Sequence, residues 1–402
     1  MRLGHLALAL LAACGPRPRP AAISNAPTPP SPAPTAAEPR FDAVLAYLRS
    51  QVDSAFPGAT IAVGYRGRVA LLAAVGHYGI DDPRPVAPET MYDLASLTKV
   101  IGLTTACMML VAEGKLELDA PVQRYVPAFT GAGKERITIR HLLTHSSGLP
   151  AWRPLYIEAT TRAVALQLAD TTPLAAEPGR VMVYSDLGAI VLTQAVEAIT
   201  GERLDQFLDR RLFGPVGMTS TRFLPPPEWR DRIAPTERSQ DGTIIRGTVH
   251  DENAWKLGGV SGHAGLFSTA GDLARFAQWL LDAREGRRRS AEGGADTASA
   301  ALRRLSPSLV QEFTRRQGLP PGSSRALGWD TPSENSSAGS KLGPNAFGHT
   351  GFTGTSIWLD PDRDLFIILL TNRVHPTREN ARIIRVRPRV ADLVVDALGS
   401  SP

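Results

Sequence analysis

Patterns typical of β-strands lie near both ends of the folded part of this chain, and helical patterns occupy the stretch between them. Near the start, the apolar runs 59–65 and 69–76 flank a short glycine-containing turn, as in a β-hairpin. Near the end, the runs 355–359 and 365–371 flank an Asp-Pro-Asp turn in the same way. A hairpin alone cannot bury its apolar face, so we expect both hairpins to share one sheet. The sequence therefore predicts an α+β fold: an antiparallel sheet flanked by helices, built from both chain ends, with an inserted mainly helical domain.

Composition agrees with one large globular domain behind an N-terminal segment. The 402 residues are 43% hydrophobic and 21% charged, which is enough apolar material for a sizeable core. We expect a folded domain over residues 41–399, with a sheet part at about 41–90 and 300–399 and a helical part at about 91–299. The helical patterns are found at 94–113, 139–143, 187–199, 272–282 and 381–398. The net charge of +5 comes from scattered Lys and Arg residues without a basic stripe, so no nucleic-acid partner is expected.

The first 14 residues have the pattern of a targeting segment. Arg2 precedes a short apolar stretch that ends at Cys14, too short for a transmembrane helix but typical of a signal peptide. The small residues before Cys14 resemble a bacterial lipobox, in which the cysteine is lipidated; an ordinary signal peptide with a chance cysteine is the alternative. Residues 15–40 are proline-rich and read as an extended linker. We therefore expect a cell-envelope protein, anchored to a membrane through Cys14, with its folded domain in the periplasm or extracytoplasmic space.

One lysine stands alone in an otherwise apolar helical stretch. Lys99 is the only charged residue between Asp93 and Glu113, and it follows Ser96 by three positions. Residues three apart share a helix face, so the ammonium group would lie beside the serine hydroxyl. A serine nucleophile needs such a partner, and the start of a helix favours a developing negative charge. Ser-x-x-Lys also recurs by chance, and the lysine could instead extend to solvent.

Two further groups carry candidate chemistry. Tyr184-Ser185-Asp186 stands where a turn meets a helix, and a tyrosine beside a cation can exchange a proton. The alternative is a buried tyrosine followed by a helix N-cap. His349-Thr350-Gly351 leads into a strand, where small residues let a substrate lie against the strand edge. Neither group identifies a site by itself.

Taken in order, these three groups resemble the motifs of the serine β-lactamase and penicillin-binding protein superfamily, in its class C-like branch. That branch includes DD-peptidases and esterases. The resemblance extends over about residues 41–399. It is supported by further matching stretches at 92–99, 114–119, 139–150, 262–269 and 348–354.

The resemblance implies a mechanism and a set of site residues. Ser96 would attack an acyl carbon and form an acyl-enzyme, while Lys99 and Tyr184 handle the proton; which of the two is the base stays open. The backbone N–H groups of Ser96 and Phe352 would form the oxyanion hole. The substrate-binding residues would be Asp186, His349, Thr350 and Gly351. The implied substrate is a small-molecule or peptidoglycan-type acyl compound, and no metal or cofactor is implied.

Two departures from the family pattern bear on the substrate. β-Lactamases of this branch usually have Asn where this chain has Asp186, and Lys where it has His349. At position 186 a carboxylate, which only accepts hydrogen bonds, replaces an amide that can donate them. At position 349 a histidine replaces the fixed positive charge of a lysine with a weaker one. Both changes favour an esterase or a DD-carboxypeptidase-like enzyme over a class C-like β-lactamase, which remains an alternative. A non-catalytic penicillin-binding sensor or scaffold lipoprotein is a second alternative, and the sequence leaves the oligomeric state open.

Three other histidines allow weaker expectations. His250 precedes a glycine-rich stretch and lies either in a loop near the pocket or in a purely structural position. His141 and His145 are four residues apart, a spacing used by zinc sites, but no third ligand follows nearby. We therefore interpret both as structural residues.

Overall fold

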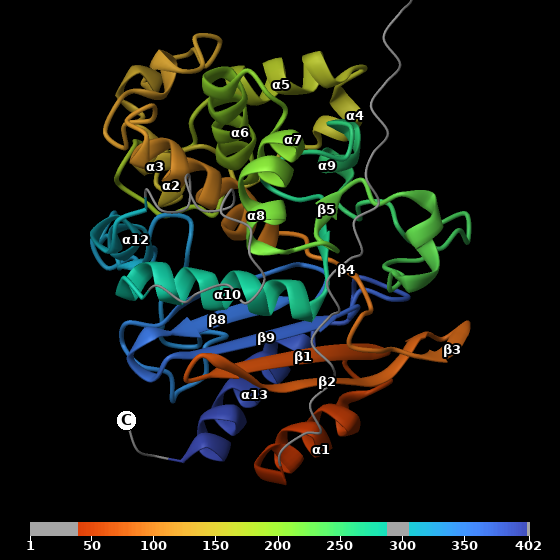
Figure 1. The fold of residues 1–402 in the computed structure, drawn as a ribbon. Helices are drawn as coiled ribbons and strands as arrows, with labels where there is room; N and C mark the ends of the chain where they lie inside the picture. The colour runs from red at the N-terminus through yellow and green to blue at the C-terminus, as the bar shows by residue number, and fades with distance from the viewer. Residues whose placement is uncertain (1–38, 288–304, 400–402) are drawn as a thin grey trace, which may run out of the picture. The chain divides into compact units, whose positions relative to one another are not determined.

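A computed structural model of the chain describes residues 39–287 and 305–399 (Figure 1). Cys14, the segment 1–14 and the linker up to residue 38 lie outside the described residues, as do residues 288–304 of the expected helical part. Within the described ranges, none of the helices combines the length and the apolar character needed to cross a bilayer.

The centre of the fold is a six-stranded sheet that joins the two ends of the domain. Its order is β3-β2-β1-β9-β8-β7, and every neighbouring pair of strands is antiparallel. The pairing of β1 with β9, with Ile61 opposite Leu369, unites the two hairpins expected from the sequence. The strands are β1 Gly58–Tyr65, β2 Arg68–Gly79, β3 Asp82–Pro85, β7 Phe347–Thr350, β8 Ser356–Asp360 and β9 Leu365–Thr371. The predicted α+β fold with a sheet built from both chain ends is confirmed.

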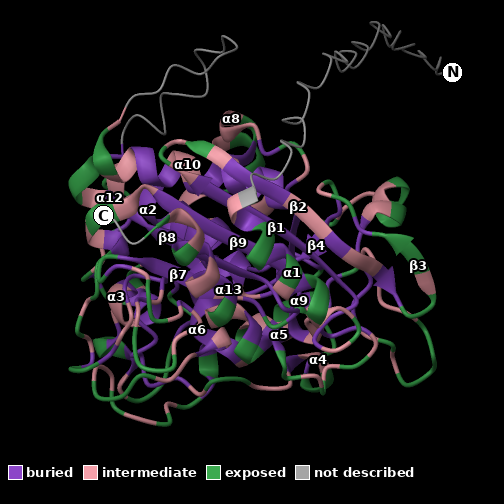
Figure 2. Ribbon diagram, turned by 90° about the horizontal axis from the view of Figure 1, so that it is seen from below, coloured by how far each residue is buried: buried purple, intermediate pink, exposed green. Residues whose placement is uncertain are grey.

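Helices cover both faces of this sheet. The terminal helices α1 (Asp42–Gln51) and α13 (Ile383–Leu398) lie on one face, and α10 (Ala270–Glu285) lies on the other (Figure 1). Strand alternation explains this, because Ile61 packs in the core under α1 and α13 while its neighbour Ala62 packs in the larger core on the opposite side. Figure 2 shows the middle strands buried along most of their length, with exposed residues gathered on loops and outer helix faces.

The inserted part is mainly helical, as expected. Its helices are α2 Thr105–Ala112, α3 Ile139–Leu143, α4 Leu155–Glu158, α5 Arg162–Thr171, α6 Asp186–Thr200, α7 Leu204–Leu208, α8 Gly214–Val216 and α9 Glu252–Lys256, and α12 Pro307–Thr314 follows α10. Short 3-10 turns are η1 Pro39–Phe41, η3 Val122–Arg124, η4 Lys134–Arg136, η6 Pro227–Arg232 and η7 Pro361–Arg363, and π-helical turns are η2 Lys99–Thr104 and η5 Asp209–Phe213. A second sheet, of order β4-β6-β5, was not expected; its strands are β4 Tyr92–Asp93, β5 Arg222–Phe223 and β6 Leu266–Ser268.

The helix predicted over 94–113 begins later and is not uniform. Ala95 has a φ of +46°, in the left-handed region that a helix cannot contain. The regular backbone follows Ser96, first as the π-helical turn η2 and then as α2, which ends at Ala112. Ser96 therefore stands at the junction between a strained backbone and the start of a buried helix.

Candidate active site

A cavity of about 760 Å³ gathers most of the residues that the sequence singled out. Its lining comes from the helical part on one side and from β7 and α13 on the other. The expected residues that line it are Ser96, Tyr184, Asp186, His349, Thr350, Gly351 and Phe352. Lys99 does not line it, but contacts Ser96 from within the helix.

Lys99 is buried and makes three polar contacts, so the alternative in which it extends to solvent is wrong. Its Nζ donates hydrogen bonds to Ser96 Oγ at 3.0 Å and to the backbone oxygen of His263 at 2.9 Å. The same atom lies 2.6 Å from Asp186 Oδ1. Burial alone would lower the pKa of Lys99, but the charge of Asp186 and the side chain of Tyr184 outweigh it and raise that pKa. The resting site therefore holds a protonated lysine.

Asp186, expected to contact substrate, lines the cavity, and the structure also places its carboxylate against Lys99. Its side chain is one-fifth exposed, and it is the first residue of α6, where an acidic group also suits the helix dipole. The preceding Ser185 caps that helix, since its hydroxyl accepts the N–H of Gly188. One short segment thus supplies both a helix cap and the counter-ion of the lysine.

Tyr184 stands beside the same ammonium group. Lys99 Nζ lies 5.0 Å from the centre of its ring. The ring is flanked by His145, at 4.5 Å between ring centres, and by His349, at 5.8 Å. Its hydroxyl is buried and makes no hydrogen bond of normal geometry within the described residues. A buried hydroxyl without a partner is uncommon, and here it lines the cavity where a substrate would bind.

The two flanking histidines are held in their neutral form. His349 Nδ1 lies 2.8 Å from the carbonyl oxygen of Thr350 and must donate to it, which leaves Nε2 as an acceptor. That Nε2 is buried and has no partner in the described part of the chain. His145 Nδ1 accepts the N–H of Ser185 at 3.1 Å. Burial, assisted by the charges of Arg325 and Lys99, lowers the pKa of both histidines well below its ordinary value. His349 therefore supplies no fixed positive charge.

The two expected oxyanion-hole donors belong to segments that are bound to each other. Thr353 Oγ1 donates to the backbone oxygen of Asp93 at 2.6 Å, and Thr355 Oγ1 donates to that of Leu94 at 2.9 Å. Within residues 39–287 and 305–399, neither the Ser96 N–H nor the Phe352 N–H donates a hydrogen bond. Two free N–H groups on docked segments beside the serine hydroxyl can stabilise an oxyanion formed there.

Buried Asp93 fixes the strained backbone before Ser96. Its carboxylate accepts the N–H of Ala95 at 2.8 Å and the N–H of His250 at 2.7 Å. His250 lines the cavity, and its ring stacks on that of Phe352 at 5.8 Å between centres. Its Nε2 lies 3.1 Å from a carboxylate oxygen of Glu237. Of the two positions expected for His250, the structure shows the one next to the pocket.

Comparison with known proteins identifies the group to which this chain belongs. The family model described as Beta-lactamase matches residues 41–391. A "Putative D-alanyl-D-alanine carboxypeptidase" of Salmonella schwarzengrund is 31% identical over 380 residues, covering 84% of this chain and 83% of the relative. The chain belongs to the beta-lactamase family. It is accordingly a serine hydrolase.

Solved structures of other proteins share the fold of this beta-lactamase family member. A structure named "A class C beta-lactamase" has a TM-score of 0.70 at 18% identity, covering 90% of this chain and 97% of that one. A structure named "EstCE1, a hydrolase with promiscuous acyltransferase activity" has a TM-score of 0.68 at 22% identity, covering 88% of this chain and 98% of that one. At these identities the likeness concerns the fold alone.

One arginine that lines the cavity belongs to none of the motifs found in the sequence. Arg325 lines the cavity, and its guanidinium carbon lies 5.2 Å from the centre of the Tyr184 ring. Its Nε and Nη1 atoms are buried and have no hydrogen-bond partner within the described residues. Arg325 stands in a loop with no recognisable motif, so no sequence signal could have revealed it.

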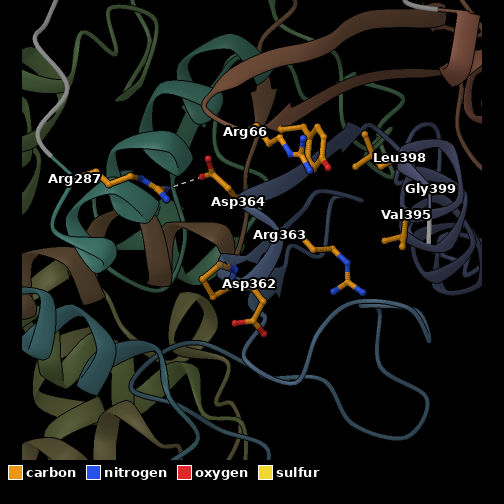
Figure 3. A pocket seen from close by; sticks show the side chains of 10 residues that line it. Arg66, Arg287, Asp362, Arg363, Asp364, Val395, Leu398 and Gly399 are labelled. Atoms are coloured by element: carbon orange, nitrogen blue, oxygen red, sulfur yellow. Dashed lines mark hydrogen bonds and ion pairs between the residues drawn. The ribbon is translucent and has the colours of Figure 1, made fainter. Parts of the chain in front are cut away.

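The remaining candidates lack comparable chemistry. No three metal-ligating side chains gather in the described part of the chain, and His141 Nδ1 instead accepts the N–H of Thr138 in a helix cap. Figure 3 shows a second hollow of about 270 Å³ at the β8–β9 turn and the end of α13. Its Arg287 pairs with Asp364 there, and no member of the serine–lysine–tyrosine group lines it.

Proposed function

We propose that this hydrolase removes the C-terminal residue from a D-amino-acid peptide through an acyl-enzyme on Ser96. The observation that supports this substrate most directly is Arg325, a cavity-lining arginine with two buried nitrogen atoms that have no partner in the described residues. A guanidinium group suits a carboxylate, which such a substrate carries next to the scissile bond. The similarity to a "Putative D-alanyl-D-alanine carboxypeptidase" supports the same class.

The contacts support a division of roles in the acyl transfer. Ser96 Oγ attacks the carbonyl carbon, and the oxygen that gains negative charge is held by the N–H groups of Ser96 and Phe352. Lys99 is already protonated, so we assign the proton transfer to the hydroxyl of Tyr184, beside the Lys99 ammonium: it accepts the Ser96 proton as it releases its own proton toward the leaving nitrogen. The leaving amine takes that proton as the C–N bond breaks. Water then attacks the acyl carbon of the Ser96 ester, and a proton returns through Tyr184 to Ser96 Oγ. The shortened peptide leaves as a carboxylic acid.

Arg325 would supply the positive charge for binding a substrate carboxylate, which neutral His349 does not supply. Neutral His349 offers Nε2 as an acceptor and cannot attract an anion. The guanidinium of Arg325 lies close enough to lower the pKa of His349, so the two groups share one region of the cavity. A substrate carboxylate bound there would place its neighbouring carbonyl group near Ser96.

An esterase is the second candidate, and the mouth of the cavity favours it. Three large apolar side chains line the cavity while remaining exposed: Trp152 at 47%, Phe352 at 50% and Ile384 at 66%. Exposed apolar groups around a site suit an uncharged, apolar acyl compound. Such a substrate would make no use of Arg325.

A substrate panel with an arginine variant distinguishes these candidates. We expect the wild type to release D-Ala from acyl-D-Ala-D-Ala and to turn over nitrocefin slower than about 10 per second. Arg325→Met should raise KM for the peptide about 10- to 100-fold, since a hydrogen bond to a charged group contributes about 1.5–3 kcal/mol. Hydrolysis of p-nitrophenyl acetate should stay within about threefold.

Arg315→Met is the matched control, because this neighbouring arginine is exposed and pairs with Glu312. It should leave both reactions unchanged. Rapid ester hydrolysis with no release of D-Ala by the wild type would favour the esterase and contradict the peptidase. If Arg325→Met lowered peptide cleavage and p-nitrophenyl acetate hydrolysis equally, Arg325 would have no specific role in binding the substrate carboxylate.

We also propose that the protein is a lipoprotein of the cell envelope, anchored through Cys14. The support is the apolar segment before Cys14 and the proline-rich linker after it. The test is metabolic labelling with palmitate in a bacterial host. Label should appear in the wild type and disappear in Cys14→Ser, and an unlabelled, secreted wild type would contradict the anchor.

A further inference from the structure

Arg387 reaches from helix α13 to the turn that follows β7. Its Nη2 donates to the backbone oxygen of Gly351 at 2.6 Å and to that of Thr355 at 2.9 Å. Gly351 and Thr355 also hydrogen-bond to each other through their backbones at 2.8 Å. One guanidinium group therefore closes the turn that carries Phe352.

The carbonyl group of Gly351 belongs to the same peptide unit as the N–H of Phe352. A peptide unit is planar and conjugated, so a cation on its oxygen draws electrons from its nitrogen. The N–H then becomes a stronger donor, as in any chain of linked hydrogen bonds. In this turn the cation is Arg387, and the N–H is the expected oxyanion donor.

We propose that Arg387 is a positioning residue that orients and polarises the Gly351–Phe352 peptide toward the oxyanion formed at Ser96. The inference rests on the proposed function, because it assumes acyl transfer at that serine. It assigns no contact between Arg387 and the substrate.

Arg387 is half-buried and lines the cavity, and the surroundings of its cation support a role beyond closing the turn. Arg387 has no carboxylate partner within the described residues, and its Nε is buried without a hydrogen bond. Burying a cation without a counter-ion is costly, whereas a neutral amide side chain could donate to the same oxygens at lower cost. Burial, followed by the charge of Arg373, lowers the pKa of Arg387 to about 9, so the group is still charged at neutral pH.

A second arginine holds the other side of the same residue. Arg373 donates through Nε to the backbone oxygen of Phe352 at 2.7 Å, and its guanidinium lies 4.3 Å from the Phe352 ring centre. Both carbonyl groups that flank the Phe352 N–H along the chain thus face cations, and the N–H stays free. The positive field of the two guanidinium groups favours the negative charge of an oxyanion next to the Phe352 N–H.

The test compares three substitutions of Arg387 with one of Arg385, an exposed arginine two residues earlier on α13. Arg387→Met removes charge and donor, Arg387→Gln keeps a neutral donor, and Arg387→Lys keeps the charge. The readouts are kcat and KM for p-nitrophenyl acetate, the labelling rate with a fluorophosphonate, and the inhibition constant of phenylboronic acid. The boronate forms a tetrahedral adduct with serine and reports on the oxyanion hole.

Arg387→Met and Arg387→Gln should lower kcat and labelling about 10- to 100-fold, less than loss of a whole oxyanion donor, which costs about 10²–10³-fold. KM should stay within about threefold, and the boronate constant should rise in parallel with the loss of kcat. Arg387→Lys should recover part of each effect, and Arg385→Met should resemble the wild type.

Two results would overturn the inference. One is a folded Arg387→Gln with unchanged kcat and boronate binding; if Arg387→Met does not fold, this variant and Arg387→Lys decide the matter. The other is a parallel change of kcat and KM with unaltered boronate affinity, which would indicate a purely structural residue. A wild type that reacts with fluorophosphonate but releases no D-Ala contradicts the proposed peptidase and leaves this inference standing.

Discussion

Ser96→Ala is expected to lower kcat/KM by at least about 10⁴-fold on every substrate that the wild type cleaves. The substitution removes the oxygen that forms the acyl-enzyme, and the neighbouring ammonium of Lys99 cannot replace it. The fold should survive, because Ser96 Oγ takes part in one hydrogen bond and Lys99 keeps its contacts with Asp186 and His263. Initial rates and the thermal unfolding midpoint of the same preparation check both statements.

Labelling with a fluorophosphonate supplies the control. The wild type and Ser50→Ala, a serine on the outer helix α1, should incorporate one label per chain, and Ser96→Ala should incorporate none. Full labelling of Ser96→Ala would show that another residue is the nucleophile. A folded wild type that takes up no label would favour the non-catalytic sensor or scaffold instead.

Local patterns were sufficient to predict the fold. Apolar runs joined by short turns marked both hairpins, and the need to bury their faces predicted the shared sheet in which β1 pairs with β9. The second sheet was missed because its strands are only two or three residues long, and Tyr92 pairs with Ser268 across a separation that no local pattern records. The strained φ of Ala95 was missed as well, since the Asp93 carboxylate that holds it also depends on distant His250.

The site was predictable only where its geometry is local or shared with a family. The Ser96–Lys99 contact follows from a spacing of three residues, whereas Tyr184 and His349 were found through the family motifs. Arg325 and Arg387 lie on a loop and on the last helix, and each meets the site through tertiary packing alone. His145 was judged structural, yet it packs against Tyr184.

The buried pair Lys99–Asp186 should separate activity from stability. Lys99→Met is expected to lower kcat about 10³-fold, within the usual range for loss of a proton-transfer group. Its effect on the free energy of unfolding should be small, because the Asp186 side chain keeps 20% exposure and can be hydrated. Asp186→Ala should behave in the opposite way, with a loss of activity nearer tenfold and a destabilisation of about 3 kcal/mol.

The difference arises from which charge is left behind. Without Asp186, the ammonium of Lys99, only 4% exposed, retains Ser96 Oγ and the His263 carbonyl as neutral partners. Loss of the negative charge also removes the main cause that raises the pKa of Lys99. Asp186→Asn is the matched variant, since its amide oxygen can still accept from the ammonium, and its stability should be intermediate. Urea unfolding and kcat are measured on all three variants. If Lys99→Met proved less stable than Asp186→Ala, the lysine would stabilise the fold, and its burial could not be attributed to catalysis.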